Sequence, residues 1–253
     1  MHFHSILTLI HTAIRQFPFI SNEQFSFLIG VIGNVTAVLV LLSPVGTFWR
    51  IVKRRSTEEF QIFPYIFGLV CASLWTYYGI IKPGGLLVAT INEVGVSIMT
   101  TYVVLFLVFA PPKVRVKAGI LVGIFDIGFL VAAILVGELG VNGKTRLDTV
   151  GILCAGLTIS VYCSPLAAMK RAVEMNSVEF MPLWLSVSMV VNGGLWALYG
   201  FLVNDKFILV SNATGYFLGT IQVLFYVVYR DGSNSSNSSR DGLEEGWLHE
   251  NLV

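Results

Sequence analysis

Seven stretches of about 20 mostly apolar residues constrain the fold of this chain more than any other feature. Each is long enough to cross a hydrocarbon core of about 30 Å as a helix that rises about 1.5 Å per residue. Strands of a membrane barrel would alternate apolar and polar residues over about 10 positions, and these stretches do not. The stretches cover residues 25–48, 63–81, 85–110, 118–136, 150–169, 181–203 and 207–229. The sequence therefore predicts an all-α membrane protein with seven transmembrane helices.

The composition supports a membrane protein and excludes several other classes. Of the 253 residues, 55% are hydrophobic and only 12% are charged, whereas soluble domains carry about 25% charged residues. The net charge of +1 indicates no nucleic-acid partner. The three cysteines and four histidines lack the spacing of a disulfide framework, a metal site or a catalytic set. We therefore expect no cofactor, no metal and no enzymatic activity.

The distribution of lysine and arginine predicts the orientation in the membrane. Eleven of these residues follow the first, third, fifth and seventh apolar runs, and five lie on the opposite side. Because cytosolic loops are enriched in lysine and arginine, the N-terminus is expected outside or in a lumen and the C-terminus in the cytosol. Residues 1–24 are an N-terminal extension, and the Ser-rich residues 231–253 are expected to be a disordered cytosolic tail.

The sequence also repeats itself at an offset of 120 or 121 residues. The matched pairs are Ser43-Pro44 with Ser164-Pro165, Leu74-Trp75 with Leu195-Trp196, Tyr78-Gly79 with Tyr199-Gly200, and Asn92-x-x-Gly95 with Asn212-x-x-Gly215. This pattern predicts a three-helix repeat over residues 25–110, a linker helix within 111–140 and a second repeat over 141–230. Three spans reverse the chain, so the single linker span restores its direction and makes the repeats parallel. Transporters place their substrate site near mid-membrane where such repeats meet.

Two repeat-related pairs of residues are candidates for that site. Asn92 and Asn212 lie inside the third and seventh runs. A lone asparagine there usually joins helices, but a matched pair offers amide donors and acceptors on both sides of one cavity. Trp75 and Trp196 lie too deep in their runs for an interfacial belt. Their flat faces suit stacking against a sugar ring, with simple packing as the alternative.

Prolines and a Tyr–Asp pair are candidates for gates at the two mouths of the cavity. The four prolines lie toward the cytosolic ends of the first, second, fifth and sixth spans, and they are Pro44, Pro64, Pro165 and Pro182. A proline removes one helix hydrogen bond, so this set predicts a cytosolic hinge and gate. On the other face, Tyr78 and Asp205 are expected to close the mouth with a hydrogen bond. Two acids are also expected inside spans. Glu93 is expected either to carry a proton or to point away from the cavity. Asp126 is expected either to have a structural partner or to have a function.

Residues 26–230 resemble the SWEET (MtN3/saliva) sugar transporters of plants. The motifs are GNVTAVLVLLSPVGTFWRIVKRRSTEEF, PY, LWTYYG and TIN-x-x-G in the first half, then SPL, KRAVEMNSVEFMPLWLS, NGGLWALYG and ND-x-F. The resemblance implies passive, bidirectional transport of mono- or disaccharides by homo-oligomers in a lipid bilayer, with the parallel repeats already known for this family. It also implies that Asn92, Asn212, Trp75 and Trp196 bind sugar, that the four prolines form the cytosolic gate, and that Tyr78 and Asp205 form the outer gate.

The segments TFWRIVKRRSTEEF and SLWTYYGIIKPG look most like the vacuolar branch of this family, whose members favour fructose and glucose. The vacuolar membrane is therefore favoured, with the plasma membrane as the alternative. The family's PNG-x-G before the last span reads here as Ser211-Asn212-Ala213-Thr214-Gly215, which keeps the Asn and the final Gly and loses the Pro. We predict a sugar uniporter that works by alternating access. The alternatives are a proton-coupled sugar carrier and a non-transporting seven-span receptor or scaffold.

Overall fold

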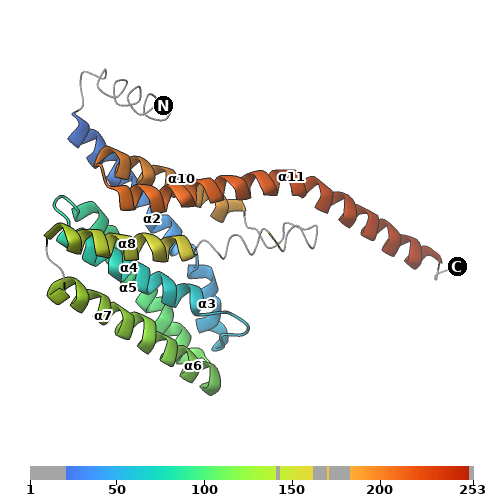
Figure 1. The fold of residues 1–253 in the computed structure, drawn as a ribbon. Coiled ribbons are helices and arrows are strands. Elements are labelled where there is room, and N and C mark those ends of the chain that lie inside the picture. Colours follow the sequence, from blue (N-terminus) through green and yellow to red (C-terminus); the bar gives the residue numbers. More distant parts are fainter. Residues whose placement is uncertain (1–20, 141–142, 162–169, 171–182, 251–253) are drawn as a thin grey trace.

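The structure, a computed structural model, describes residues 21–140, 143–161, 170 and 183–250, with the backbone alone for Leu185 and for residues 229–250. Every regular element in this part of the chain is a helix, which confirms the all-α prediction (Figure 1). The first half contains α2 (Asn22–Leu42), α3 (Val45–Arg54), α4 (Phe63–Ile81) and α5 (Leu86–Phe109). The linker contains α6 (Pro112–Val122), η1 (Gly123–Phe129), α7 (Leu130–Leu135) and η2 (Val136–Gly140). The second half contains α8 (Gly143–Val161), α10 (Leu183–Leu202) and α11 (Lys206–Glu250).

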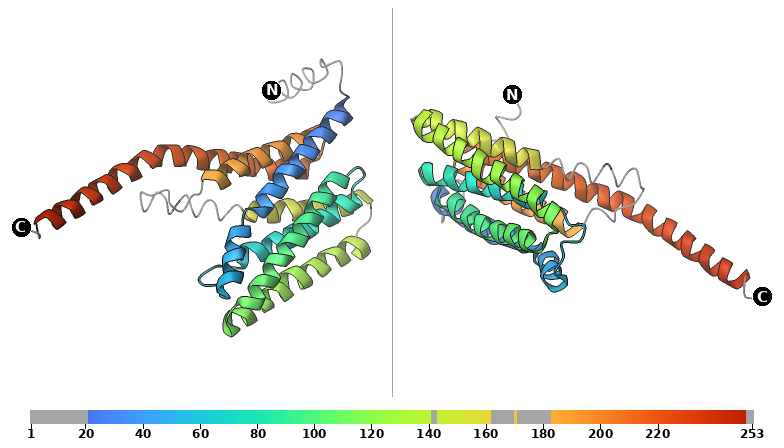
Figure 2. Two further views of the ribbon diagram at one scale, coloured as in Figure 1. Left: turned by 180° about the vertical axis from the view of Figure 1, so that it is seen from behind. Right: turned by 90° about the horizontal axis from the view of Figure 1, so that it is seen from below.

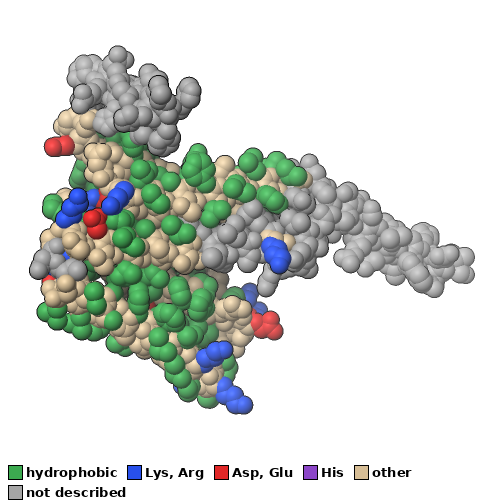
Figure 3. Space-filling model, viewed as in Figure 1, with side chains coloured by type: hydrophobic (Ala, Val, Ile, Leu, Met, Phe, Trp, Pro, Cys, Tyr) green, Lys and Arg blue, Asp and Glu red, His purple; other side chains and the backbone are tan. Residues whose placement is uncertain are grey.

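The distribution of apolar and charged residues on these helices is that of a multi-pass membrane protein. Among the described residues, five helices are long and apolar enough to cross a bilayer: Asn22–Arg54, Phe63–Ile81, Leu86–Phe109, Pro112–Gly140 and Lys206–Val228. The stretch Ser186–Leu202 in α10 is also apolar but shorter, and α8 begins with several charged residues before its apolar part. On the face drawn in Figure 3, charged side chains gather toward the two ends of the bundle and an uncharged band lies between them.

The first span is broken rather than straight. α2 ends at Leu42 and α3 begins at Val45, so the break falls at Ser43-Pro44, inside the apolar run 25–48. Proline has no N–H and its ring crowds the preceding turn, which explains a break at this residue. Packing stabilises the new direction, because Phe48 of α3 stacks on Tyr102 of α5 with ring centroids 4.3 Å apart.

The linker helix is longer than the run 118–136, and two π-helical segments, η1 and η2, interrupt it. It packs mainly against α4 of the first half. Asp126 lies in η1, and both of its carboxylate oxygens are buried without a hydrogen-bond partner in the described part of the chain. A structural partner for Asp126 is therefore not found there. Near the other end, Glu138 of η2 pairs with Arg146 of α8 and accepts a hydrogen bond from Tyr77 of α4 at 3.0 Å.

The two halves meet along two boundaries. α2 of the first half packs against α10 of the second, and α4 packs against α8. Within each half, two consecutive helices form a closely packed hairpin, α4 with α5 and α10 with α11. Figures 1 and 2 show α10 and α11 side by side and the linker on the far side of α4. The 3+1+3 order expected from the sequence is therefore the observed order.

Two repeat-related glycines allow the hairpins to pack closely. A Cβ atom on Gly79 would lie 2.5 Å from the backbone nitrogen of Ala89, and one on Gly200 would lie 2.6 Å from that of Leu209. Both contacts are with the backbone of the next helix, which cannot turn aside as a flexible side chain can. The repeated Tyr-Gly motif thus marks the point of closest approach between helices in each half.

We expect Gly79→Ala and Gly200→Ala each to destabilise the protein by about 1–3 kcal/mol, because the added methyl overpacks a helix contact. Thermal unfolding of the purified protein in detergent would measure this as a lower melting temperature. Gly119→Ala is the matched control, since a Cβ there has no atom within 4 Å. Equal melting temperatures for all three variants would contradict the close packing described here.

The last helix continues further than expected. α11 runs to Glu250, whereas the sequence predicted disorder over residues 231–253. In Figures 1 and 2 this part of α11 extends away from the bundle. Helix hydrogen bonds close within four residues, so a polar segment can form them without contributing to a core.

Candidate functional site

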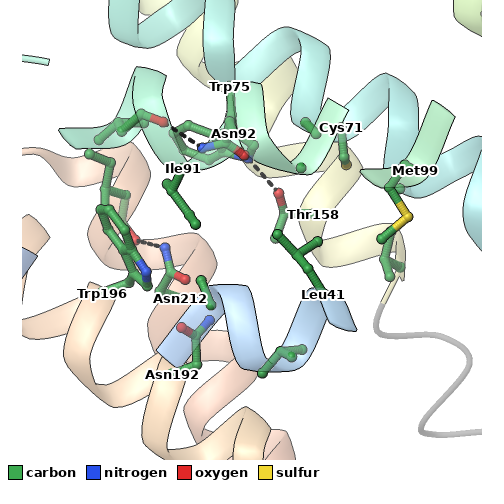
Figure 4. A pocket seen from close by; sticks show the side chains of 18 residues that line it. Leu41, Cys71, Trp75, Ile91, Asn92, Met99, Thr158, Asn192, Trp196 and Asn212 are labelled. Carbon is green, nitrogen blue, oxygen red and sulfur yellow. Dashed lines mark hydrogen bonds between the residues drawn. The ribbon is translucent and has the colours of Figure 1, made fainter. Parts of the chain in front are cut away.

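A cavity of about 320 Å³ lies between the two halves. All three spans of the first half contribute to its wall through α2, α4 and α5, and so do α8, α10 and α11 of the second half (Figure 4). The linker helix does not line it. Most lining side chains are apolar, and the polar ones are few. Small-molecule sites have this composition, because a few convergent polar groups orient a ligand within an apolar enclosure.

The structure brings the four predicted binding residues together in this cavity. Asn92 comes from α5 and Asn212 from the equivalent point of α11. The two amides are held in the same way: Asn92 Nδ2 donates to Val88 O at 2.8 Å, and Asn212 Nδ2 donates to Ile208 O at 2.9 Å. Asn92 retains one N–H and its carbonyl oxygen for a ligand. Asn212 retains its carbonyl oxygen, and its Nδ2 also lies 3.5 Å from the Ser211 hydroxyl. The asparagines are therefore oriented by their own helices without being used up as helix-to-helix contacts.

The two tryptophans are also placed alike. Trp75 meets Tyr78 edge-on with ring centroids 5.3 Å apart, and Trp196 meets Tyr199 edge-on at the same distance. Trp75 is only 8% exposed and Trp196 only 6%. Most of each indole is therefore covered by protein, and only a limited part of it faces the cavity.

A polar cluster around Asp205 lies one helical turn from the cavity wall, beside Trp75 of α4 and Ile208 of α11. The Tyr78 hydroxyl donates to Asp205 Oδ2 at 2.7 Å, which is the hydrogen bond predicted from the sequence. Lys82 Nζ forms an ion pair with the same oxygen. The other oxygen, Oδ1, accepts from the backbone N–H groups of Phe207 and Ile208 at 2.9 and 3.0 Å, so Asp205 also caps α11. Asp205 is only 4% exposed, and both of its carboxylate oxygens have partners.

Among the described residues, this cluster joins the two halves only once, without a counterpart at the repeat-related position. The position equivalent to Asp205 is Gly85, where a Cβ would lie 2.4 Å from the carbonyl oxygen of Gly79. No side chain fits there, and the position equivalent to Lys82 is Val203. In this cluster α4 supplies the tyrosine and the lysine, and α11 supplies the acid.

Comparisons with known proteins show the family of this chain. A family model described as "Sugar efflux transporter for intercellular exchange" matches two stretches of the chain, residues 27–114 and 148–234. This chain belongs to the SWEET (MtN3/saliva) family. It is 46% identical over 229 residues to "Bidirectional sugar transporter SWEET17" of Arabidopsis thaliana, covering 88% of this chain and 95% of the relative. It is 48% identical over 209 residues to SWEET16 of the same plant, covering 82% and 91%.

A solved structure of a eukaryotic SWEET transporter has the same fold. It matches with a TM-score of 0.77 at 36% sequence identity, covering 81% of this chain and 97% of that chain. The cavity of this SWEET protein therefore lies in a fold shared with an experimentally solved member of the family. The relatives are named as transporters rather than enzymes.

Two of the prolines expected to form a gate in this SWEET protein, Pro44 and Pro64, are described by the structure and do not line the cavity. Pro44 marks the break between α2 and α3, and Pro64 lies in the first turn of α4. Proline costs no hydrogen bond in a first turn, so Pro64 marks a helix start rather than a kink. Pro165 and Pro182 lie outside the described residues.

Sequence reasoning missed three polar residues of the site. Lys82 follows Tyr78 by one helical turn, and this spacing could have indicated that both side chains lie on the same face of α4. Thr158 accepts a hydrogen bond from Trp75 Nε1 at 2.9 Å. Asn192 lines the cavity, and its Oδ1 accepts from the Thr36 hydroxyl at 3.1 Å. Neither Thr158 nor Asn192 is matched by a like residue in the other half, so the repeat could not reveal them.

Proposed function

We propose that this chain is a bidirectional, facilitative transporter of a hexose, with fructose or glucose as substrate. The observation that carries the proposal is the cavity between the two halves, lined by one asparagine and one tryptophan from each half. Asparagine amides donate to and accept from hydroxyl groups, which cover the edge of a sugar ring. The relatives named as bidirectional sugar transporters support the same function.

The size of the cavity favours a monosaccharide. Its volume of about 320 Å³ is at the lower end of the range of about 300–1,000 Å³ typical of small-molecule sites. A hexose has one ring for the cavity to enclose, whereas a disaccharide has two. The apolar wall suits the C–H faces of a single ring, and the few polar groups suit its hydroxyls.

Alternating access is the mechanism that we propose for transport. The two halves would rock about the central site and open it to one side at a time. Tyr78, Lys82 and Asp205 would form the outer gate, and the structure would then have its outer mouth closed. The break at Pro44, together with Pro64, Pro165 and Pro182, would form the cytosolic hinge and gate. No energy source is required, because the sugar gradient alone sets the direction of net flow.

The resemblance to the vacuolar branch of the family leads us to propose the vacuolar membrane as the location. The N-terminus would lie in the lumen and the C-terminus in the cytosol, as the distribution of lysine and arginine predicts. The family resemblance also leads us to propose a homo-oligomer.

Transport by the purified chain in liposomes would test the function. Liposomes preloaded with unlabelled fructose or glucose are expected to take up the labelled sugar faster than empty ones, because a facilitator exchanges sugar across the bilayer in both directions. Liposomes without protein are the control. A chain that inserts and folds yet exchanges no sugar would instead support the scaffold alternative.

Proton coupling is the second mechanism considered, and the position of Glu93 argues against it. Glu93 is exposed on α5 and is not part of the cavity wall, although its neighbour Asn92 is. Successive residues are rotated by about 100° around the helix axis, so the side chains of Asn92 and Glu93 point in different directions. We expect Glu93→Gln to transport sugar at the wild-type rate, and an imposed pH gradient to cause no accumulation of sugar. Accumulation that the gradient drives in the wild type and Glu93→Gln abolishes would show proton coupling.

A further inference from the structure

Resting on the proposed function, we infer that Thr158 is a positioning residue that fixes the indole of Trp75 across the boundary between the two halves. Its hydroxyl accepts from Trp75 Nε1 at 2.9 Å and donates to the carbonyl oxygen of Cys154 at 2.8 Å. The single hydroxyl proton is therefore committed to α8, which leaves the oxygen lone pairs facing α4. Two bonds of fixed direction determine where the indole N–H must point.

The repeat shows that this arrangement is specific to one tryptophan. At the offset of 121 residues, Thr158 corresponds to Ala37 and Cys154 to Gly33. Trp196 instead packs closely over Gly33, where a Cβ would lie 3.2 Å from the indole Cε2 and Nε1 atoms. Within the described part of the chain, no protein acceptor takes the Trp196 N–H. One indole is thus held by a hydrogen bond and the other by backbone contact.

This difference gives the two sides of the cavity different chemistry. The Trp75 N–H is occupied, so this ring can offer a sugar only its π surface and C–H edge. The Trp196 N–H remains able to donate, since the indole nitrogen is a donor only. Figure 4 shows Thr158 bonded to Trp75, with Trp196 across the pocket from Thr158. Thr158 therefore makes the two tryptophans of the pseudo-symmetric cavity unequal as hydrogen-bond donors.

Loss of the Thr158 hydroxyl should weaken sugar binding. The Trp75 indole is already held in its binding orientation by Thr158, so it loses less conformational freedom when the sugar binds. We expect Thr158→Val to raise the half-saturating sugar concentration about threefold to tenfold, the effect of losing one such hydrogen bond. Thr158→Ser keeps the hydroxyl and should restore the wild-type value. Thr76→Val is the matched control, because Thr76 lies outside the cavity wall and its hydroxyl donates to the Ala72 carbonyl oxygen of its own helix at 2.9 Å.

A double-mutant cycle with Trp75→Phe separates positioning from direct contact with sugar. Phenylalanine keeps an aromatic ring but has no N–H, so Thr158→Val should have no further effect in the Trp75→Phe background. If Thr158 contacts the sugar itself, the threefold to tenfold loss will persist in that background, and the inference is overturned.

A second measurement needs no sugar and so is independent of the proposed function. Near-ultraviolet circular dichroism reports how rigidly tryptophans are held. Thr158→Val should weaken the tryptophan bands of the wild type and leave the spectrum of Trp75→Phe unchanged. Identical spectra for the wild type and Thr158→Val would overturn the inference. Failure of the wild type to exchange sugar would overturn the proposed function alone.

Discussion

Asn92→Ala and Asn212→Ala are each expected to reduce sugar exchange by about tenfold or more. Each amide has a carbonyl oxygen left for the sugar after its bond to its own helix, and the Asn92 amide also has an N–H left. Each lost hydrogen bond is worth about 0.5–1.5 kcal/mol. Because the two residues lie in equivalent places in the two halves, we expect losses of similar size. Initial rates of labelled-sugar exchange in liposomes would measure both.

Asn34→Ala is the matched control for the asparagine variants. Asn34 lies in α2 outside the cavity wall, and its amide donates to the Thr90 hydroxyl at 3.4 Å. It should therefore exchange sugar like the wild type. Wild-type exchange by Asn92→Ala or Asn212→Ala, at equal amounts of inserted protein, would show that this cavity is not the sugar site.

Asp205→Ala is expected to destabilise the protein more than any other substitution proposed here, by about 3–5 kcal/mol. It leaves the Lys82 ammonium and the Tyr78 hydroxyl without their acceptor and removes the cap from two backbone N–H groups of α11. The Lys82 side chain is only 16% exposed, so water cannot fully replace the lost carboxylate. Thermal unfolding in detergent would show the loss.

Two milder variants separate the contributions to this cluster. Asp205→Asn keeps an oxygen for the α11 cap but removes the charge that pairs with Lys82. Tyr78→Phe removes one hydrogen bond, worth about 1 kcal/mol. The expected order of melting temperatures is Tyr78→Phe above Asp205→Asn, and Asp205→Ala lowest. If Asp205→Ala melted like the wild type, the cluster would not stabilise the contact between α4 and α11.

The break in the first span and the length of the last helix show how far apolar patterns predict helix boundaries. An apolar run ends where polar residues begin, but a helix ends where its hydrogen bonds end. Pro44 therefore divides the run 25–48, and α11 passes beyond residue 229 without interruption. Hydropathy located the spans and could not locate their ends.

The sequence alone determined that this chain forms membrane helices in two equivalent halves and that Asn92, Asn212, Trp75 and Trp196 belong to one site. These features are local or repeated, because length, apolarity and a constant offset can be read along the chain. Only the tertiary structure decided that Thr158 holds Trp75, that Lys82 shares Asp205 with Tyr78, and that Gly85 leaves no room for a second such cluster. The contacts of Thr158 and Asp205 join residues of helices that are far apart in the sequence. No periodicity in the chain predicts which of these residues meet.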